Sequence, residues 1–254
     1  MVTHIFVQAR LKSTRLPCKI LKKICGKSIL ELIISRLKKV KNIDEIMIVT
    51  GTTENNTSLI EECNRLGIRY FCGNEENILD RIYKASLAFN SDVIIRVTGD
   101  CPLIDATLIN DGLEVFYKNE YDFLSNYRNR TFPDGLDFEI FRKTALEKAW
   151  TDKMMEYNND KEEFSKISLN PVQYMLDSVK FKKYDLINNH DNLSNLRLTL
   201  DYPEDLELIT RIYDALFQQN KFFGLSEILE LIQKNPQLRH INEKYAIDYR
   251  KADS

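Results

Sequence analysis

Four cationic side chains follow the first apolar run of the chain and lie within ten residues of one another. They are Arg10, Lys12, Arg15 and Lys19, directly after the run from His4 to Gln8. Arginine forks and lysine ammonium groups both suit phosphate oxygens, so the loop predicts a triphosphate site. The loop lacks the spacing of a P-loop, which disfavours a P-loop kinase or ATPase. The alternative is a solvated loop whose charge is incidental.

Two aspartates, Asp100 and Asp201, each come directly after an apolar run that is typical of a strand. Gly99 lets the backbone turn just before Asp100. A carboxylate that faces a triphosphate needs a hard cation between them, and Mg²⁺ is commonly held by one or two carboxylates plus phosphate oxygens. Both aspartates are therefore candidate magnesium ligands. The alternatives are a turn or helix cap at Asp100 and the amino cap of the next helix at Asp201.

The elements that must position these residues alternate between short apolar runs and segments of helical period. This rhythm predicts an α/β fold with a largely parallel central sheet flanked by helices, in which ligands bind at the carboxyl ends of the strands. Four strands, each apolar on both faces and so expected to be buried, are predicted at residues 4–8, 45–50, 68–72 and 92–98. Helices are predicted at residues 28–39, 57–66 and 78–89.

The pattern changes after Asp100, although the chain still predicts one domain over residues 1–254. Helices are expected at residues 105–117 and 144–150, from Pro203 onward and at 226–234, with strands at 122–126, 136–141 and 196–200. Residues 151–168 lack a clear period, and we expect a mobile excursion or a subunit contact there. Residues from about 122 to 200 are expected to form the acceptor side and a possible dimerisation surface.

Composition narrows the class of protein. The chain has 36 Lys+Arg and 38 Asp+Glu, a net charge of -2, so it lacks the basic footprint of a nucleic-acid-binding protein. The five cysteines have no zinc or redox spacing, which favours reduced thiols in the cytoplasm. No apolar segment approaches the roughly 20 residues that span a bilayer. A small ligand is the expected partner, with neither nucleic acid nor membrane.

Several motifs occur together in a fixed order. They are the cationic loop, Leu79-Asp80-Arg81, the run from Thr98 to Asp105, the run from Pro133 to Glu139, and Asp201-Tyr202-Pro203-Glu204-Asp205. Over nearly the whole chain this order resembles the cytidylyltransferase family. It looks most like the branch of spore coat polysaccharide biosynthesis protein F-like proteins, which is related to acylneuraminate and 3-deoxy-manno-octulosonate cytidylyltransferases.

The resemblance implies a single nucleotidyltransferase domain of the glycosyltransferase-A type, Rossmann-like and three-layered. It also implies an enzyme that uses CTP and Mg²⁺ to join CMP to a sugar acid or related acceptor, with release of pyrophosphate, in surface polysaccharide or glycoconjugate biosynthesis. Relatives often pair, so a homodimer is possible.

Site residues follow from the same resemblance. Arg10, Arg15 and Lys19 would contact the triphosphate and, with Asp100, carry catalysis. The remaining nucleotide-binding residues would be Gln8, Ala9, Lys12, Ser13, Arg81, Thr98 and Gly99. Asp100 and Asp201 would hold Mg²⁺. Asn126, Asp137 and Glu139 would face the acceptor.

Two positions depart from the family pattern, because relatives usually carry glycine where this chain has Lys12 and Cys18. Glycine permits positive φ and close approach of the backbone to phosphate. A catalytically silent nucleotide-binding protein is therefore one alternative. The other is a glycosyltransferase on the same fold, although such enzymes commonly carry an Asp-x-Asp pair where this chain has Gly99-Asp100-Cys101.

Overall fold

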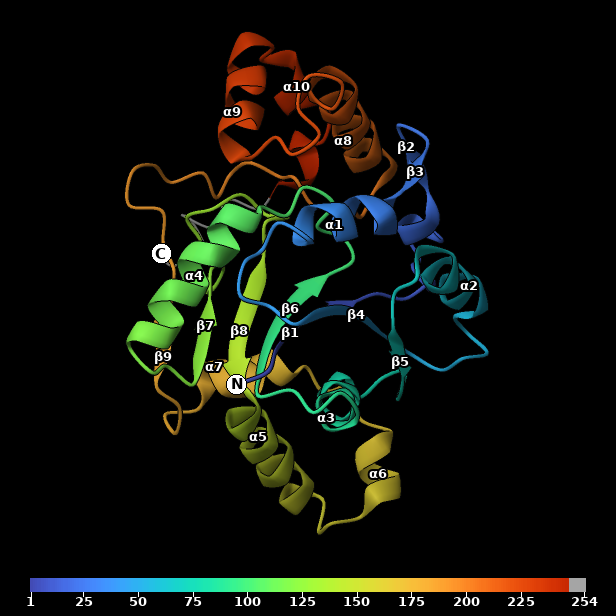
Figure 1. The fold of residues 1–254 in the computed structure, drawn as a ribbon, viewed down its shortest axis with the longest axis vertical. Helices are drawn as coiled ribbons and strands as arrows, with labels where there is room; N and C mark the ends of the chain where they lie inside the picture. Colours follow the sequence, from blue (N-terminus) through green and yellow to red (C-terminus); the bar gives the residue numbers. More distant parts are fainter. Residues whose placement is uncertain (247–254) are drawn as a thin grey trace.

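The computed structural model describes residues 1–246, which form a central seven-stranded sheet covered by helices (Figure 1). The strand order is β5-β4-β1-β6-β8-β7-β9. The strands are β1 (Thr3–Gln8), β4 (Glu45–Thr50), β5 (Tyr70–Cys72), β6 (Val93–Thr98), β7 (Phe123–Ser125), β8 (Phe138–Arg142) and β9 (Lys183–Asp185). All neighbours pair in parallel except β8, which runs antiparallel to both β6 and β7. The predicted α/β fold with a largely parallel sheet is confirmed.

Helices cover both faces of the sheet and make a three-layer arrangement (Figure 1). One layer contains α1 (Ile29–Leu37), α2 (Thr57–Leu66), α4 (Ala106–Lys118), α8 (Pro203–Leu216) and α9 (Leu225–Lys234). The other contains α3 (Ile78–Ala88), α5 (Lys143–Glu156) and α7 (Pro171–Asp177). Successive β1 residues alternate between the layers, since Ile5 and Val7 pack in the first and Phe6 in the second. This two-sided burial explains why the central strands are apolar on both faces.

Side-chain caps set where the main helices begin. Ser28 accepts a hydrogen bond from the backbone of Glu31 and starts α1, and Asn77 does the same for α3 through Asp80. Asp105 caps α4 by accepting from Thr107. The predicted helices in this half of the chain are therefore confirmed, with boundary shifts of a residue or two.

Two short elements complete the front of the chain. The antiparallel strands β2 (Lys23–Ile24) and β3 (Lys27–Ser28) are joined by Cys25 and Gly26, both at positive φ, as a tight hairpin turn requires. A 3-10 turn, η1 (Lys19–Leu21), precedes them.

Several sequence predictions need correction. β5 lies at the edge of the sheet and Tyr70 is exposed, so this strand is not buried on both faces. Residues 196–200 form no strand; only Arg197 makes an isolated bridge, with Asp134. Residues 151–168 are not irregular throughout, because α5 continues to Glu156 and α6 (Lys161–Ser165) follows. The chain then continues through α7 to β9, neither of which was predicted. The last described elements are α10 (Gln237–His240) and η2 (Glu243–Tyr245).

Candidate active site

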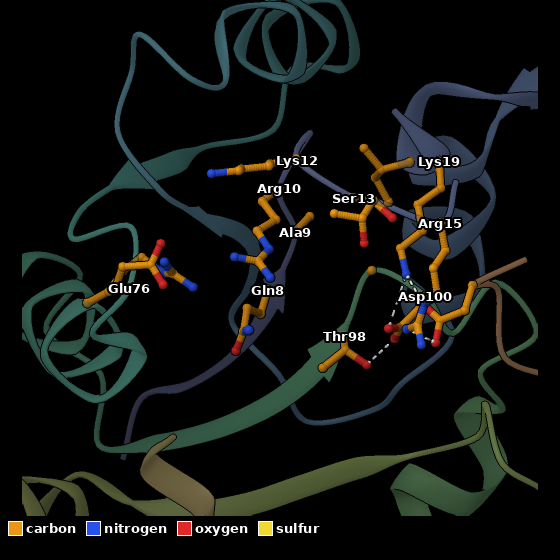
Figure 2. Close-up of a pocket in the computed structure, with 15 residues that line it drawn as sticks. Gln8, Ala9, Arg10, Lys12, Ser13, Arg15, Lys19, Glu76, Thr98 and Asp100 are labelled. Atoms are coloured by element: carbon orange, nitrogen blue, oxygen red, sulfur yellow. Dashed lines mark hydrogen bonds and ion pairs between the residues drawn. The ribbon is translucent and has the colours of Figure 1, made fainter. Parts of the chain in front are cut away.

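A cavity of about 480 Å³ opens at the carboxyl ends of β1 and β6 (Figure 2). These strands are parallel neighbours, and Gln8 at the end of one pairs with Thr98 at the end of the other. The cavity lies where an open α/β sheet places its ligands. It is lined by Gln8, Ala9, Arg10, Lys12, Ser13, Thr14, Arg15, Lys19, Ile20, Glu76, Arg81, Thr98, Gly99, Asp100 and Asp201. Every nucleotide-binding, catalytic and metal-binding candidate from the sequence therefore borders this one cavity.

The loop after β1 is held by a backbone hydrogen bond of its own and by the side chain of Asn56. The Cys18 amide donates to the Leu11 carbonyl at 3.2 Å, and the Leu11 amide donates to Asn56 Oδ1 at 3.0 Å. Cys18 lies in the left-handed region, at φ 52 and ψ 29, which explains physically why glycine suits this position. Lys12 is not among the described residues at positive φ, so its side chain causes no such strain.

Two cations of this loop meet the two distant aspartates at one end of the cavity. Lys19 Nζ lies 3.3 Å from Asp100 Oδ2 and 2.8 Å from Asp201 Oδ1, and Arg15 Nη2 lies 2.8 Å from Asp201 Oδ2. Burial alone would lower the pKa of Lys19, but Asp100 and Asp201 outweigh it and raise that pKa. Burial would likewise raise the pKa of Asp100, yet Lys19 and Thr98 hold it below its usual value. The carboxylate and the ammonium stabilise each other in their charged forms.

Neither aspartate serves as a helix cap. Asp105 caps α4, which leaves Asp100 free to face the cavity. At α8, Asp205 Oδ2 accepts from the backbone amides of Asp201 and Tyr202, both at 2.9 Å, so the Asp201 side chain does not cap the helix. The Leu200 amide donates to the Asp100 carbonyl at 2.8 Å, and this contact brings the two aspartate segments together.

The opposite end of the cavity contains Arg81 and Glu76; in Figure 2, Glu76 lies across the cavity from Lys19 and Asp100. Arg81 is only 1% exposed and donates to the carbonyls of Asn74 at 2.6 Å and Glu75 at 3.1 Å. Burial lowers the pKa of Arg81 to about 10. Sequence reasoning missed Glu76, because it lies in a turn before α3 and does not directly follow a strand.

The three acceptor-side candidates do not line the cavity. The side chain of Asn126 is hydrogen-bonded to backbone groups: it donates to the Leu136 carbonyl at 2.8 Å and accepts from the Phe138 amide at 3.0 Å. Glu139 is 3% exposed and accepts from Arg96 Nη1 at 2.6 Å, so it supports the sheet beneath the site.

Asp137 is engaged by a single arginine. Both of its oxygens pair with Arg130, at 2.6 and 2.7 Å. Contact of these three residues with an acceptor stays a prediction.

Among residues 1–246, no group of three or more His, Cys, Asp or Glu side chains has the geometry to hold a metal ion. Cys101 is buried, and burial raises the pKa of its thiol well above the usual value. A thiol held protonated is a poor nucleophile, so Cys101 is not a candidate for covalent catalysis. None of the described helices combines the length and apolar character needed to cross a bilayer.

Known proteins resemble this chain over almost its full length. The sequence model of the family described as cytidylyltransferase matches residues 4–236. An uncharacterized protein of Methanocaldococcus jannaschii is 34% identical over 238 residues, covering 93% of this chain and 92% of that protein. The spore coat polysaccharide biosynthesis protein SpsF of Bacillus subtilis is 28% identical over 240 residues, covering 91% of this chain and 93% of that protein.

A solved structure described as a cytidylyltransferase from Leptospira borgpetersenii superposes with a TM-score of 0.80 at 31% identity. The match covers 94% of this chain and 97% of that one. The family model, the similar proteins and the position of the cavity all indicate the same family. The chain belongs to the cytidylyltransferase family of nucleotidyltransferase enzymes, and it resembles the SpsF-like branch.

Proposed function

We propose that the protein transfers CMP from CTP to a sugar acid or a related small acceptor and releases pyrophosphate. The observation that carries this proposal is the meeting of Arg15 and Lys19 with Asp100 and Asp201 around one cavity. Membership of the cytidylyltransferase family supports CTP as the donor. Similarity to SpsF supports a role in surface polysaccharide or glycoconjugate biosynthesis.

In the proposed reaction an oxygen of the acceptor attacks the α-phosphorus of CTP. The bond from that phosphorus to the bridging oxygen breaks, and pyrophosphate leaves with the bonding electrons; a hydroxyl acceptor also loses its proton to solvent. Arg10, Arg15 and Lys19 would bind the triphosphate and offset the charge that develops on the leaving group. Lys12 would add a further cation on the same loop.

Mg²⁺ is proposed as the cofactor, held by Asp100 and Asp201. The two carboxylates fit this role because both already converge on one cationic atom, Lys19 Nζ. Two carboxylates with phosphate oxygens make an ordinary magnesium environment. When bound, the metal would supply positive charge to the triphosphate.

Incubation of the purified protein with CTP, Mg²⁺ and a panel of sugar acids tests the proposal. We expect pyrophosphate in a coupled assay and a CMP-linked product by mass spectrometry. Transfer of a sugar from a ready-made nucleotide sugar would instead support a glycosyltransferase. Binding of CTP without pyrophosphate from any acceptor would support a silent nucleotide-binding protein. Either result contradicts the proposed reaction.

A homodimer that uses residues from about 122 to 200 is also proposed. This portion exposes three large apolar side chains, Met155 at 60%, Val179 at 97% and Ile187 at 40%. Light scattering after gel filtration measures the mass directly, and a mass equal to one chain over the micromolar range would contradict the dimer.

A further inference from the structure

Glu76 is an unpaired carboxylate in a cavity whose remaining charge is mostly positive. Its side chain is exposed, and within residues 1–246 no hydrogen bond or ion pair engages the carboxylate. The other two acids of the cavity, Asp100 and Asp201, lie at the opposite end and are both paired with Lys19. Glu76 therefore offers two free acceptor oxygens to whatever occupies its end of the cavity.

The backbone that carries Glu76 is held from several sides. Asn74 Oδ1 accepts from the amides of Glu76 at 2.9 Å and Asn77 at 2.8 Å. Asn74 and Asn77 donate their own amide groups to carbonyls of α6, at Ser165 and Phe164. Arg81 holds the carbonyls of Asn74 and Glu75 from within the cavity wall. The fixed backbone keeps the carboxylate within reach of this end of the cavity, while the side chain stays free to turn toward a ligand.

Charge decides which part of a nucleoside triphosphate can lie beside Glu76. A carboxylate repels phosphate, so the phosphates should stay with Arg15 and Lys19, which lie on the side of the cavity away from Glu76 in Figure 2. The uncharged nucleoside is left to take the end of the cavity that Glu76 borders (Figure 2). A carboxylate there needs a hydrogen-bond donor, and cytosine has one in its exocyclic amino group, whereas uracil has a carbonyl oxygen at the same place. Arg81, which lines the same end, can donate to the acceptor atoms of the base.

We propose that Glu76 accepts a hydrogen bond from the exocyclic amino group of bound cytosine and so makes the cavity select CTP over UTP. The proposal rests on the proposed function, because it assumes that a cytidine nucleotide occupies this cavity. Uracil would place an acceptor oxygen against the carboxylate and leave both groups without a donor. UTP would therefore lose this hydrogen bond and bring an oxygen with partial negative charge against the carboxylate, which weakens its binding.

Calorimetric titration of CTP and UTP with Mg²⁺ and no acceptor measures this selection without turnover. We expect the wild-type protein to bind CTP at least about tenfold more tightly than UTP, as one hydrogen bond to a charged group allows. Glu76→Gln should reduce the ratio of affinities roughly tenfold, because the amide can present its oxygen to cytosine or its NH₂ group to uracil. Glu54→Gln, a matched change at an exposed residue outside the cavity lining, should leave the ratio unchanged.

Two further measurements separate this proposal from its rivals. The thermal midpoint without ligand should be the same in Glu76→Gln and wild type, and affinity for inorganic tripolyphosphate should not fall, because the substitution removes only a repulsion. A CTP to UTP ratio that survives the substitution overturns the base contact. Loss of discrimination between CTP and its 2′-deoxy form, with the CTP to UTP ratio intact, would assign Glu76 to the ribose and also overturn it. Failure of the wild type to bind CTP at all would defeat the proposed function itself.

Discussion

Asp100 and Asp201 bear the proposed metal chemistry through their carboxylate charge. Asp100→Asn and Asp201→Asn keep the shape of each side chain and remove that charge, so each should lower turnover by about a hundredfold or more. The thermal midpoint should fall only modestly, because in each variant Lys19 keeps the other aspartate as a partner. Pyrophosphate release with CTP and Mg²⁺ is the measurement, and chelation of the metal should abolish it in the wild type.

The matched control for those two variants is Asp191→Asn, since Asp191 is exposed and outside the cavity lining. It should retain normal turnover. Near-normal rates in both Asp100→Asn and Asp201→Asn would remove the metal assignment.

Cys18 has a left-handed backbone conformation, which strains any residue that carries a Cβ and so lowers stability. Cys18→Gly should raise the free energy of unfolding by about 0.5–1 kcal/mol, because relief of the Cβ clash exceeds the extra entropy of the unfolded glycine chain. Chemical denaturation measures the change. Cys18→Ala keeps the Cβ and removes the thiol, so it should show no such gain. Equal stabilisation by both substitutions would place the cause in the thiol.

At the scale of elements, the turn at Gly135 must fit against the segment from Leu196 to Leu200. Gly135 has φ +104, and a Cβ there would lie 2.3 Å from the backbone atoms Leu198 C and Thr199 N. The Leu198 amide donates to the Asp134 carbonyl at 2.6 Å, so the two segments cannot separate without loss of that bond. Close backbone packing of this kind is available only to glycine.

Gly135→Ala should therefore destabilise the protein by about 2–4 kcal/mol and move the segment that carries Asp201. Gly67→Ala is the matched control, because Gly67 also has positive φ, at +65, but nothing lies within 4 Å of its Cβ position. That variant should lose only about 1 kcal/mol. Denaturant midpoints report both changes, and equal losses would show that backbone strain rather than packing governs position 135.

At the scale of the whole molecule, ion pairs connect two segments that lie about 60 residues apart in the chain, around Asp134 and around Arg197. Asp134 lies 3.1 Å from Arg197 and 3.9 Å from Arg130. Arg197 also pairs with Asp205 at 2.9 Å, which fixes the start of α8 next to Asp201. Burial raises the pKa of Asp134 from its usual 3.8 to about 6, and the negative charge of Asp137 adds to this effect.

This raised pKa makes stability depend on pH with a definite sign. Between about pH 4 and 6 the folded protein holds a proton on Asp134 that the unfolded chain has released, so the contribution of this group to stability falls as pH rises. As pH rises through that window, the free energy of unfolding of Asp134→Asn should increase relative to that of the wild type, by up to about 3 kcal/mol. Denaturation at several pH values measures the difference. A difference that is flat, or that favours the wild type at higher pH, would show that Arg197 and Arg130 dominate.

The sequence by itself determined the features that depend on neighbouring residues. Apolar runs on both faces identified β1, β4 and β6, and the helical period of the segments between them identified α1, α2 and α3. Because parallel strands end at one sheet edge, the loop after β1 and the residues after β6 could be assigned to the same cavity. Asp201 joined that set because it follows the apolar run at residues 196–200, although that run forms no strand.

Only the tertiary structure decided the features that depend on partners far along the chain. The segment from Leu196 to Leu200 looks like a strand because it is apolar, yet it bonds to Asp134 and Asp100 in loops and not to a strand. Glu139 has the spacing of a site residue, but its charge pairs with Arg96 below the cavity. Glu76 faces the cavity because Asn74 and Arg81 shape its turn. A local pattern reports burial and period, whereas the partner that satisfies a backbone amide or a charge is set by how distant segments pack.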